Sequence, residues 1–443
     1  MRILSGLAIF GVALSVLAAG RSFASYASVK PVLDQQRGQL PPELKNADQA
    51  KWIAWSQAQD KAIRARLDQG DLDSMVNLLL LGTSFTKQPR ILLENLSEAS
   101  KTGAVRARVD DLVAGLRNPG DNERLVFLTG LLRSQGIDPG SPGESGVFIY
   151  KNLLRVVEER KTIAERAKQA DPASLLDRKS LFSDRGVSLD TSILPDFSIE
   201  QALRDLKTRG VLREGQVARV AVIGPGLDFI DKNEESGYDY YPQQTLQPFA
   251  LYDSLVRLRL AKENALSMTI LDISARVIGH VQHARELARK NQGYLIQLPL
   301  DVARPWPPEL IAYWNSLGDQ VGTVVPPIQP PTLFRGLETR AVRIRPNVVL
   351  ATDPADLNIV LERAAQKFDL MVGTNIFVYY DAFEQALALE NAGAMLKRGG
   401  LLLTNDRLPA VPGGSMRLDG ITVVPYGPAG VNALQAVGWY RKQ

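Results

Sequence analysis

The sequence contains no cysteine and only two histidines among its 443 residues. The absence of cysteine excludes disulfide bonds, thiolate nucleophiles and zinc sites with thiolate ligands. His280 and His283 stand three residues apart and could share one face of a helix, but two ligands without a third do not make a metal site. We therefore expect no metal centre and no catalysis by a thiol.

The chain also lacks a strong excess of charge of either sign. Lys and Arg together number 52, against 48 Asp and Glu, and the basic residues are scattered rather than clustered. Such a balance is typical of a mixed-charge protein surface and predicts no nucleic-acid partner. The length and the 45% content of hydrophobic residues are sufficient for two or three domains with real cores.

Residues 1–27 have the layout of a secretory signal. Arg2 precedes an apolar stretch at residues 3–19, and small residues follow, so that cleavage is expected after Ala24 or Ala27. The stretch is long for a signal and short for a membrane-spanning helix, which needs about 20 residues. An uncleaved membrane anchor and a packing helix of a cytoplasmic protein therefore stay open as alternatives. The first two readings predict export or membrane association through residues 3–19.

Residues 28–180 carry helical patterns with little strand character, which predicts an all-α domain. The first helix places Trp52, Trp55, Ile63 and Leu67 near one face at intervals of three and four residues. No residue in this region has a spacing that demands chemistry, and no repeat of fixed period is evident. Glycine and proline punctuate the predicted helices, which cover residues 50–67, 72–81, 89–100, 104–116, 122–135 and 146–170.

An apolar run from Val217 to Ile223 stops at Gly224 and Gly226, and Asp228 follows. Such a run predicts a buried parallel strand that enters a tight turn, where the backbone can approach a ligand closely. The ligand expected at such a turn is a nucleotide. The turn is not a P-loop, because no Gly-Lys-Ser/Thr follows it, and a dinucleotide fingerprint would need a third glycine where Phe229 stands.

Acidic and amide side chains follow the next predicted strands. Asp272 ends the strand that begins at Leu266, where a carboxylate can accept two hydrogen bonds from a ribose diol. Asp353 is expected at the tip of a short strand that begins at Asn347. Asn375 opens the loop after a strand from Lys367, and Tyr379 lies four residues further on. A helix at residues 382–395, a strand at 401–405 and an antiparallel pair at 421–424 and 435–440 complete the predicted sheet.

Together these motifs resemble the class I S-adenosylmethionine-dependent methyltransferases, and the Asn375 region is most similar to the chemotaxis-receptor branch. The resemblance covers about residues 185–443. It implies an α/β fold with a doubly wound, mostly parallel sheet and an antiparallel last strand, at residues 181–443, preceded by the all-α domain. It further implies that Gly224 and Gly226 lie against S-adenosylmethionine, that Asp272 holds its ribose, that Asp353 accepts from the adenine amino group, and that Asn375 lines the reaction cleft.

Two positions depart from the family pattern. Val222 stands where the family has an acid that holds the methionine ammonium group, and Asp228 stands at a third glycine. Asp228, or Asp231 and Glu234 in the following loop, could replace the missing acid. That loop is longer than usual, so its tyrosines, together with the one after Asn375, are candidates for a cofactor cap or an acceptor pocket: Tyr238, Tyr240, Tyr241 and Tyr379.

Methyl transfer asks little of protein side chains, because the sulfonium is already activated and rate comes mainly from alignment of acceptor, methyl group and sulfur. The sequence therefore assigns no catalytic residue and no acceptor. Two functions follow from the resemblance and the leader. One is an S-adenosylmethionine-dependent methyltransferase. The other is a non-catalytic, exported or membrane-associated binding or scaffold protein with a degenerate methyltransferase fold, which Val222 favours.

Overall fold

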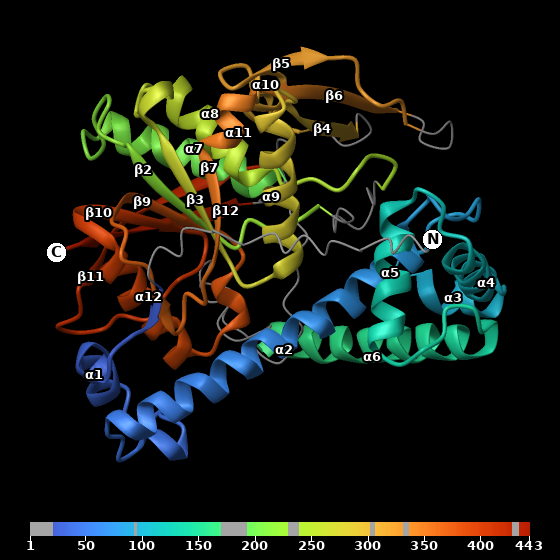
Figure 1. Cartoon of the computed structure of the whole chain (residues 1–443), viewed down its shortest axis with the longest axis horizontal. Helices are drawn as coiled ribbons and strands as arrows, with labels where there is room; N and C mark the ends of the chain where they lie inside the picture. The colour runs from blue at the N-terminus through green and yellow to red at the C-terminus, as the bar shows by residue number, and fades with distance from the viewer. Residues whose placement is uncertain are drawn as a thin grey trace, which may run out of the picture.

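A mixed sheet of seven strands organises the second half of the chain in a computed structural model, which describes residues 21–92, 95–169, 193–228, 239–301, 306–330, 336–427 and 434–443 (Figure 1). The strand order is β11-β12-β10-β9-β2-β3-β7. All strands run parallel except β12, which pairs antiparallel with both of its neighbours. The predicted mostly parallel sheet with an antiparallel last strand is thus confirmed. The strands are β2 (Arg219–Ile223), β3 (Ser267–Asp272), β7 (Thr352–Asp356), β9 (Phe368–Gly373), β10 (Leu396–Thr404), β11 (Met416–Pro425) and β12 (Leu434–Lys442).

The central strand β2 shows why its sequence is apolar throughout. Val220 and Val222 point into the core on one face of the sheet, and Ala221 and Ile223 point into the core on the other. A strand that is covered on both faces needs a continuous apolar run instead of an alternating one. The first core also contains α7 (Ile193–Thr208), α8 (Gln247–Arg257), the end of α9 (Ala275–Arg289), α10 (Pro308–Ser316) and α11 (Pro346–Leu350).

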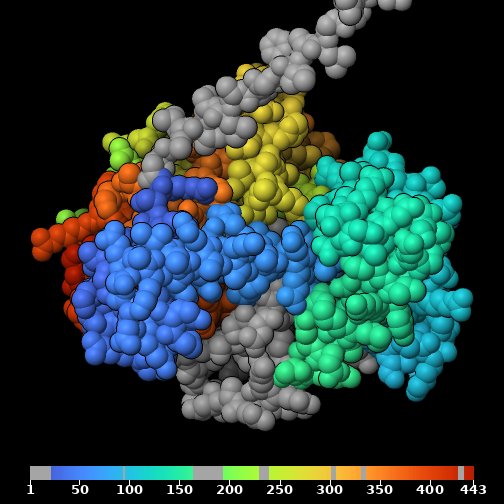
Figure 2. Space-filling view, turned by 60° about the horizontal axis from the view of Figure 1, so that its bottom comes forward, coloured from blue at the N-terminus to red at the C-terminus, as the bar shows by residue number. Residues whose placement is uncertain are grey.

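The second core brings distant parts of the chain together. It joins α12 (Ala382–Met395) to α1 (Tyr26–Gln35), the 3₁₀ turn η1 (Pro42–Leu44) and the first half of α2 (Gln49–Leu81). Trp52 and Ile63 of α2 are buried in it. In Figure 2 this N-terminal segment lies over the sheet domain, and the helical bundle stands beside it.

The second half of α2 leaves the sheet and enters the helical bundle. From Met75 to Leu81 it packs in a separate core with α4, α5 and α6. The two helices that were predicted on either side of Gly70 are therefore one helix of 33 residues. A glycine inside a helix costs only about 1 kcal/mol, which packing on both sides offsets. The bundle helices are α3 (Leu96–Lys101), α4 (Ala104–Arg117), α5 (Glu123–Ser134) and α6 (Pro142–Gln169).

Two smaller sheets were not predicted. The antiparallel sheet β4-β6-β5 lies in the chain between β3 and β7. A two-residue strand near the N-terminus pairs with another after β7. These strands are β4 (Tyr294–Asp301), β5 (Gly322–Val325), β6 (Leu337–Ile344), β1 (Ser22–Phe23) and β8 (Glu362–Arg363), and the short turns are η3 (Glu263–Ala265) and η4 (Phe377–Tyr379).

The predicted leader lies largely outside the described residues, which begin at Arg21. Both expected cleavage points fall within packed structure. The Ala24 carbonyl accepts a hydrogen bond of 2.6 Å from the Trp52 indole, and Ala27 is in α1. Within the described part of the chain, no helix has the length and apolar character to cross a bilayer. A signal or anchor at residues 3–19 therefore stays a prediction.

The predicted domain boundaries at residues 27 and 180 also stay predictions. Between α1 and the end of α6 the described residues form helices and turns, as expected for an all-α region. The hydrophobic cores divide elsewhere, however. Residues from Val29 to Ile63 share the core of the sheet, whereas the bundle core begins at Met75.

Candidate functional site at the carboxyl edge of the sheet

The order of the strands reverses between β2 and β9. From β2 the chain adds β3 and β7 on one side, and β9 and β10 then build the other side. In open parallel sheets, ligands bind in the crevice outside the carboxyl ends of the strands at such a reversal. The loop after β2 and the loop after β9 meet there, and both contain residues that the sequence singled out.

The loop after β2 requires glycine for two reasons. Gly224 and Gly226 have φ values of 57° and 75°, which side chains disfavour. A Cβ atom on Gly224 would also lie 2.8 Å from Cδ1 of Ile376, the residue after Asn375. The Gly224 amide donates to the Leu271 carbonyl at 2.9 Å, which ties the turn to β3. The glycine turn therefore holds the two loops against each other.

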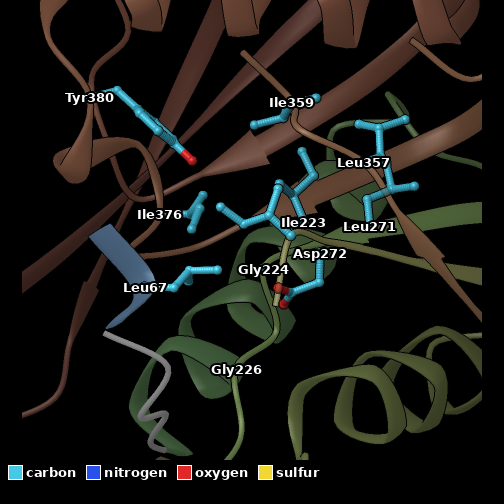
Figure 3. A pocket seen from close by; sticks show the side chains of 11 residues that line it. Leu67, Ile223, Gly224, Gly226, Leu271, Asp272, Leu357, Ile359, Ile376 and Tyr380 are labelled. Atoms are coloured by element: carbon cyan, nitrogen blue, oxygen red, sulfur yellow. The ribbon is translucent and has the colours of Figure 1, made fainter. Parts of the chain in front are cut away.

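A small cavity lies at this turn. It measures about 30 Å³, which is space for about one water molecule. Its lining is mainly apolar, and Asp272 is the acid among the described residues around it (Figure 3). The lining comes from the carboxyl ends of four strands and from α2: Leu67, Ile223, Gly224, Gly226, Leu271, Asp272, Ile273, Leu357, Ile359, Ile376 and Tyr380.

Asp272 occupies the predicted position at the end of β3. It is 5% exposed, and Figure 3 shows its carboxyl group turned toward the glycine turn. Burial raises its pKa to about 7, and the nearby negative charge of Asp356 acts in the same direction. The amides of Ser274 and Ile273 act in the opposite direction, and the Ser274 amide donates to Oδ1 at 2.7 Å. Asp272 is thus a buried acid that titrates near neutral pH.

Asp353 is not at the tip of a strand, and its predicted site is wrong. The apolar residues before it form the one-turn helix α11, and Asp353 is the second residue of β7, level with Thr269 near the amino end of β3. Its side chain is largely exposed and pairs with Arg285 at 3.3 Å. Asp356 takes the expected place instead, because it ends β7 directly beside Asp272.

Asn375 lies after β9 as predicted, but its side chain is engaged away from the cavity. Its Oδ1 accepts from Nδ2 of Asn405 at 2.7 Å, and its amide donates to Oδ1 of Asn405 at 2.8 Å. The φ of Asn375 is 57°, so the pair holds the loop in a left-handed turn. That turn brings the next residue, Ile376, into the cavity.

Tyr240, Tyr241 and Tyr379 are the predicted tyrosines with described positions, and they do not line the cavity. Tyr241 is buried and donates to Asp228 at 2.9 Å, and Gln244 donates to the same oxygen at 3.1 Å. The Tyr240 hydroxyl lies 2.6 Å from the Thr339 hydroxyl on β6. Tyr379 is half-buried in η4, and its neighbour Tyr380 reaches the cavity. Tyr238, Asp231 and Glu234 lie outside the described residues.

Asp228 therefore packs the loop that follows the glycine turn and is not part of the cavity lining. Val222 is fully buried in β2, so no carboxylate stands at that point. Of the histidines, His280 is half-buried, with Nε2 at 2.8 Å from the Tyr294 hydroxyl, and desolvation lowers its pKa to about 4. Among the residues with described positions, no three His, Asp or Glu side chains gather as a metal site.

The end of the long loop after the glycine turn is fastened to the helical bundle. Asp239 is 3% exposed and accepts hydrogen bonds from both the amide and the hydroxyl of Thr83, at 2.9 and 2.7 Å, and from the Ser84 amide at 2.9 Å. Thr83 and Ser84 directly follow α2. The buried guanidinium of Arg108 supports the same helix end by donating to the Leu79 and Gly82 carbonyls.

We expect replacement of Asp239 by alanine to lower the free energy of unfolding by about 2–3 kcal/mol, because three part-buried hydrogen bonds to a charged acceptor are lost. Hydrogen exchange at the Thr83 and Ser84 amides should accelerate. Asp239→Asn keeps one carbonyl oxygen and should lose less stability. If hydrogen exchange at these two amides is unchanged in the alanine variant, Asp239 does not hold the end of the loop against the residues after α2.

The site fits a nucleoside cofactor in its chemistry and not in its volume. A carboxylate at the end of β3 beside a turn of bare backbone suits a ribose. Pockets for ligands of drug size measure about 300–1,000 Å³, whereas this cavity measures about 30 Å³. The side chains that fill the difference include Leu67 of α2 and Ile376.

Comparison with known proteins gives neither a family nor a curated relative. No family model matches the sequence, and no curated protein matches it. Solved structures with a similar fold include TrmN from Thermus thermophilus, with 9% identity and a TM-score of 0.26. The match covers 56% of this chain, which spans about half of that protein, 52% of its length.

Two further neighbours are methyltransferases by name. The N-methyltransferase NodS from Bradyrhizobium japonicum WM9 has 12% identity and a TM-score of 0.29, over 57% of this chain and 99% of NodS. Magnesium protoporphyrin IX methyltransferase from Synechocystis PCC 6803, solved with bound S-adenosylmethionine, has 9% identity and a TM-score of 0.27, over 56% and 81% of the two chains. Scores this low carry no functional argument, so function must be argued from the site.

Proposed function

We propose that this protein is an S-adenosylmethionine-dependent methyltransferase whose cofactor site lies between the carboxyl ends of β2 and β9. One observation carries the proposal: the reversal of strand order brings the glycine turn and the buried Asp272 to the same cavity. Bound S-adenosylmethionine would supply an activated methyl group. The methyl acceptor stays open, as does the finer resemblance to the chemotaxis-receptor branch.

The residues take the following roles in this proposal. Asp272 accepts hydrogen bonds from the ribose hydroxyls, and the backbone of Gly224 and Gly226 approaches the cofactor. Asp356 replaces Asp353 as the acid at the neighbouring strand end. Asn375 acts through its backbone turn, which sets the position of Ile376.

A second candidate function is supported by the small cavity. A non-catalytic binding or scaffold protein could keep the fold and fill the cofactor site with its own side chains, as Leu67 and Ile376 do here. Burial of Val222 in place of an acid agrees with this candidate. Export or membrane association through residues 3–19 belongs to the same proposal.

Calorimetric titration with S-adenosylmethionine and S-adenosylhomocysteine tests the first candidate. We expect both to bind the full chain, and Asp272→Ala to weaken binding about tenfold or more, because a buried hydrogen bond to a charged group contributes about 1.5–3 kcal/mol. Asp353→Ala is the matched control, because this acid lies near the amino end of β7, is largely exposed and does not line the cavity.

If Asp353→Ala weakens binding as much as Asp272→Ala does, the proposed site is contradicted. If Asp272→Ala binds as tightly as the wild type, the ribose role of Asp272 is contradicted. A folded chain that takes up neither compound at millimolar concentration, even with the cavity opened as described below, would remove the methyltransferase proposal. The scaffold candidate would then stand.

A further inference from the structure

Helix α2 crosses the carboxyl edge of the sheet on its way to the bundle. Figure 1 shows it running from α1, beneath the sheet, to the helices beside α6. The part that passes the cavity, residues 60–71, is named the α2 strap here. Arg64 and Leu67 are one turn apart on it and therefore share one face.

Arg64 engages the ends of two strands at once. Its guanidinium donates to the Asp356 carboxylate, at the end of β7, at 2.8 Å and to the Ile273 carbonyl, just after β3, at 3.3 Å. Asp60, one turn earlier, holds the same guanidinium at 3.0 Å and accepts from Asn358 at 2.8 Å. Asp356, the acid proposed in place of Asp353, is thus paired with the strap.

Leu67 enters the cavity itself. It packs with Leu227, which lies between the second glycine and Asp228, and with Val277 of α9. It also lines the cavity together with Asp272 and the glycine turn. A leucine side chain thus occupies space beside the proposed ribose site, and a ligand of nucleoside size requires its departure.

The two ends of α2 are held by different parts of the molecule. Trp52 fixes the first half in the core of the sheet, whereas Thr83, after the last turn, binds Asp239 on the far side of the loop that begins at the glycine turn. Gly70 lies between these two anchors, and a glycine weakens a helix locally. Movement of the bundle would therefore act on both the strap and the loop.

We infer that the α2 strap closes the cavity at the β2–β9 reversal and that its displacement opens a site for a ligand of nucleoside size. The identity of that ligand rests on the proposed function, whereas the closure rests on Arg64 and Leu67. Only the fraction of molecules with an open strap binds, so the apparent affinity is reduced by that fraction.

A single introduced thiol measures the opening directly, because the chain has no cysteine of its own. Ile359 lines the cavity and is 3% exposed. We would replace it by cysteine and follow labelling with a maleimide. Leu67→Ala should accelerate labelling about tenfold or more, since loss of the apolar contacts of Leu67 with Leu227 and Val277 weakens the closed state.

Two controls separate strap opening from general loosening. Leu72→Ala, on the same helix, removes a leucine that packs on the bundle core and should leave labelling at Ile359→Cys unchanged. A thiol at Val156 in α6, which is 1% exposed, should label at the same rate with and without Leu67→Ala. Arg64→Met removes the ion pair, keeps the apolar contact, and should also accelerate labelling.

The rate of labelling at Ile359→Cys tests the closure by the strap, and binding of S-adenosylhomocysteine tests the proposed function. Faster labelling with Leu67→Ala and Arg64→Met supports the closure, whereas an unchanged rate in both variants overturns it. S-adenosylhomocysteine should bind the Leu67→Ala protein more tightly than the wild type. Faster labelling without any binding of S-adenosylhomocysteine would support the strap and overturn the cofactor proposal. Equally tight binding by the wild type and Leu67→Ala, with unchanged labelling, would support the cofactor proposal and overturn the strap.

Discussion

Replacement of Trp52 by alanine is expected to lower the free energy of unfolding by about 3–5 kcal/mol, as is usual for a buried tryptophan. Trp52 is 1% exposed, stacks on Trp55 with ring centroids 5.3 Å apart, and donates to the Ala24 carbonyl. It thereby joins the N-terminal segment, α2 and the sheet. Chemical denaturation of the full chain measures the loss.

The same variant tests where the domains divide. Because Trp52 belongs to the core of the sheet, hydrogen exchange should accelerate in β10 and α12 and change least in α4 and α6. Trp52→Phe keeps a ring and drops the hydrogen bond, so it should lose less stability. Greater loss of protection in the bundle would instead support a helical domain that begins near residue 28.

The sheet could be predicted because its strands are buried on both faces. Continuous apolar runs at β2, β3 and β9, each ended by glycine or an acid, leave little choice of structure. The predicted antiparallel pair at the C-terminus is confirmed as β11 and β12. The glycine turn followed from the same pattern, since it stops the central run.

The error at Asp353 has a physical cause. A short apolar run such as the one after Pro346 suits a buried strand or one turn of helix equally well, and periodicity cannot separate them. Proline at the first helical position favours the helix, and the strand then begins five residues later than predicted. That shift moves the acid at the strand end from Asp353 to Asp356.

The closure of the site could not be predicted from the sequence. Leu67 was correctly placed on the apolar face of a helix, but its partners are about 160 and 210 residues away. The sequence does not single out Arg64, because arginine is common on the polar face of an amphipathic helix. Its partner Asp356 is 292 positions away in the chain, too far for a sequence pattern to connect the two. Only the path of α2 across the sheet shows that Leu67 lines the cavity and that Arg64 pairs with the end of β7.

This path also reconciles the two candidate functions. A catalytic protein needs the cavity to open, whereas a scaffold protein needs it to stay closed. The contacts of Arg64 and Leu67 set the balance between these states, and a ligand shifts it only by binding the open state better. If the ligand is S-adenosylmethionine, as proposed, valine in place of an acid at position 222 would weaken its binding to the open state without changing the balance between the two states.

A large effect of pH is expected at Asp272. Burial raises its pKa from the ordinary value to about 7, so the folded state binds a proton more tightly than the unfolded state between about pH 4 and pH 7. The contribution of Asp272 to the free energy of unfolding should therefore fall as the pH rises through this window, by up to about 4 kcal/mol. Denaturation curves of the wild type and of Asp272→Asn at pH 4 to 8 measure this contribution as the difference between the two slopes.

Asp272→Asn should remove the contribution of Asp272 to the slope and leave the protein more stable than the wild type at pH 8, because asparagine stays neutral and still accepts from the Ser274 amide. Other buried carboxyl groups with raised pKa values, such as Asp196 and Asp253, keep their own contributions. Asp369 gives a control of opposite sign. Burial acts to raise its pKa, but hydrogen bonds from Lys397 and two amides hold it below its usual range, so its contribution is lost as the pH falls. If the difference in stability between the wild type and Asp272→Asn stays constant from pH 4 to pH 8, the titration of this buried acid is contradicted.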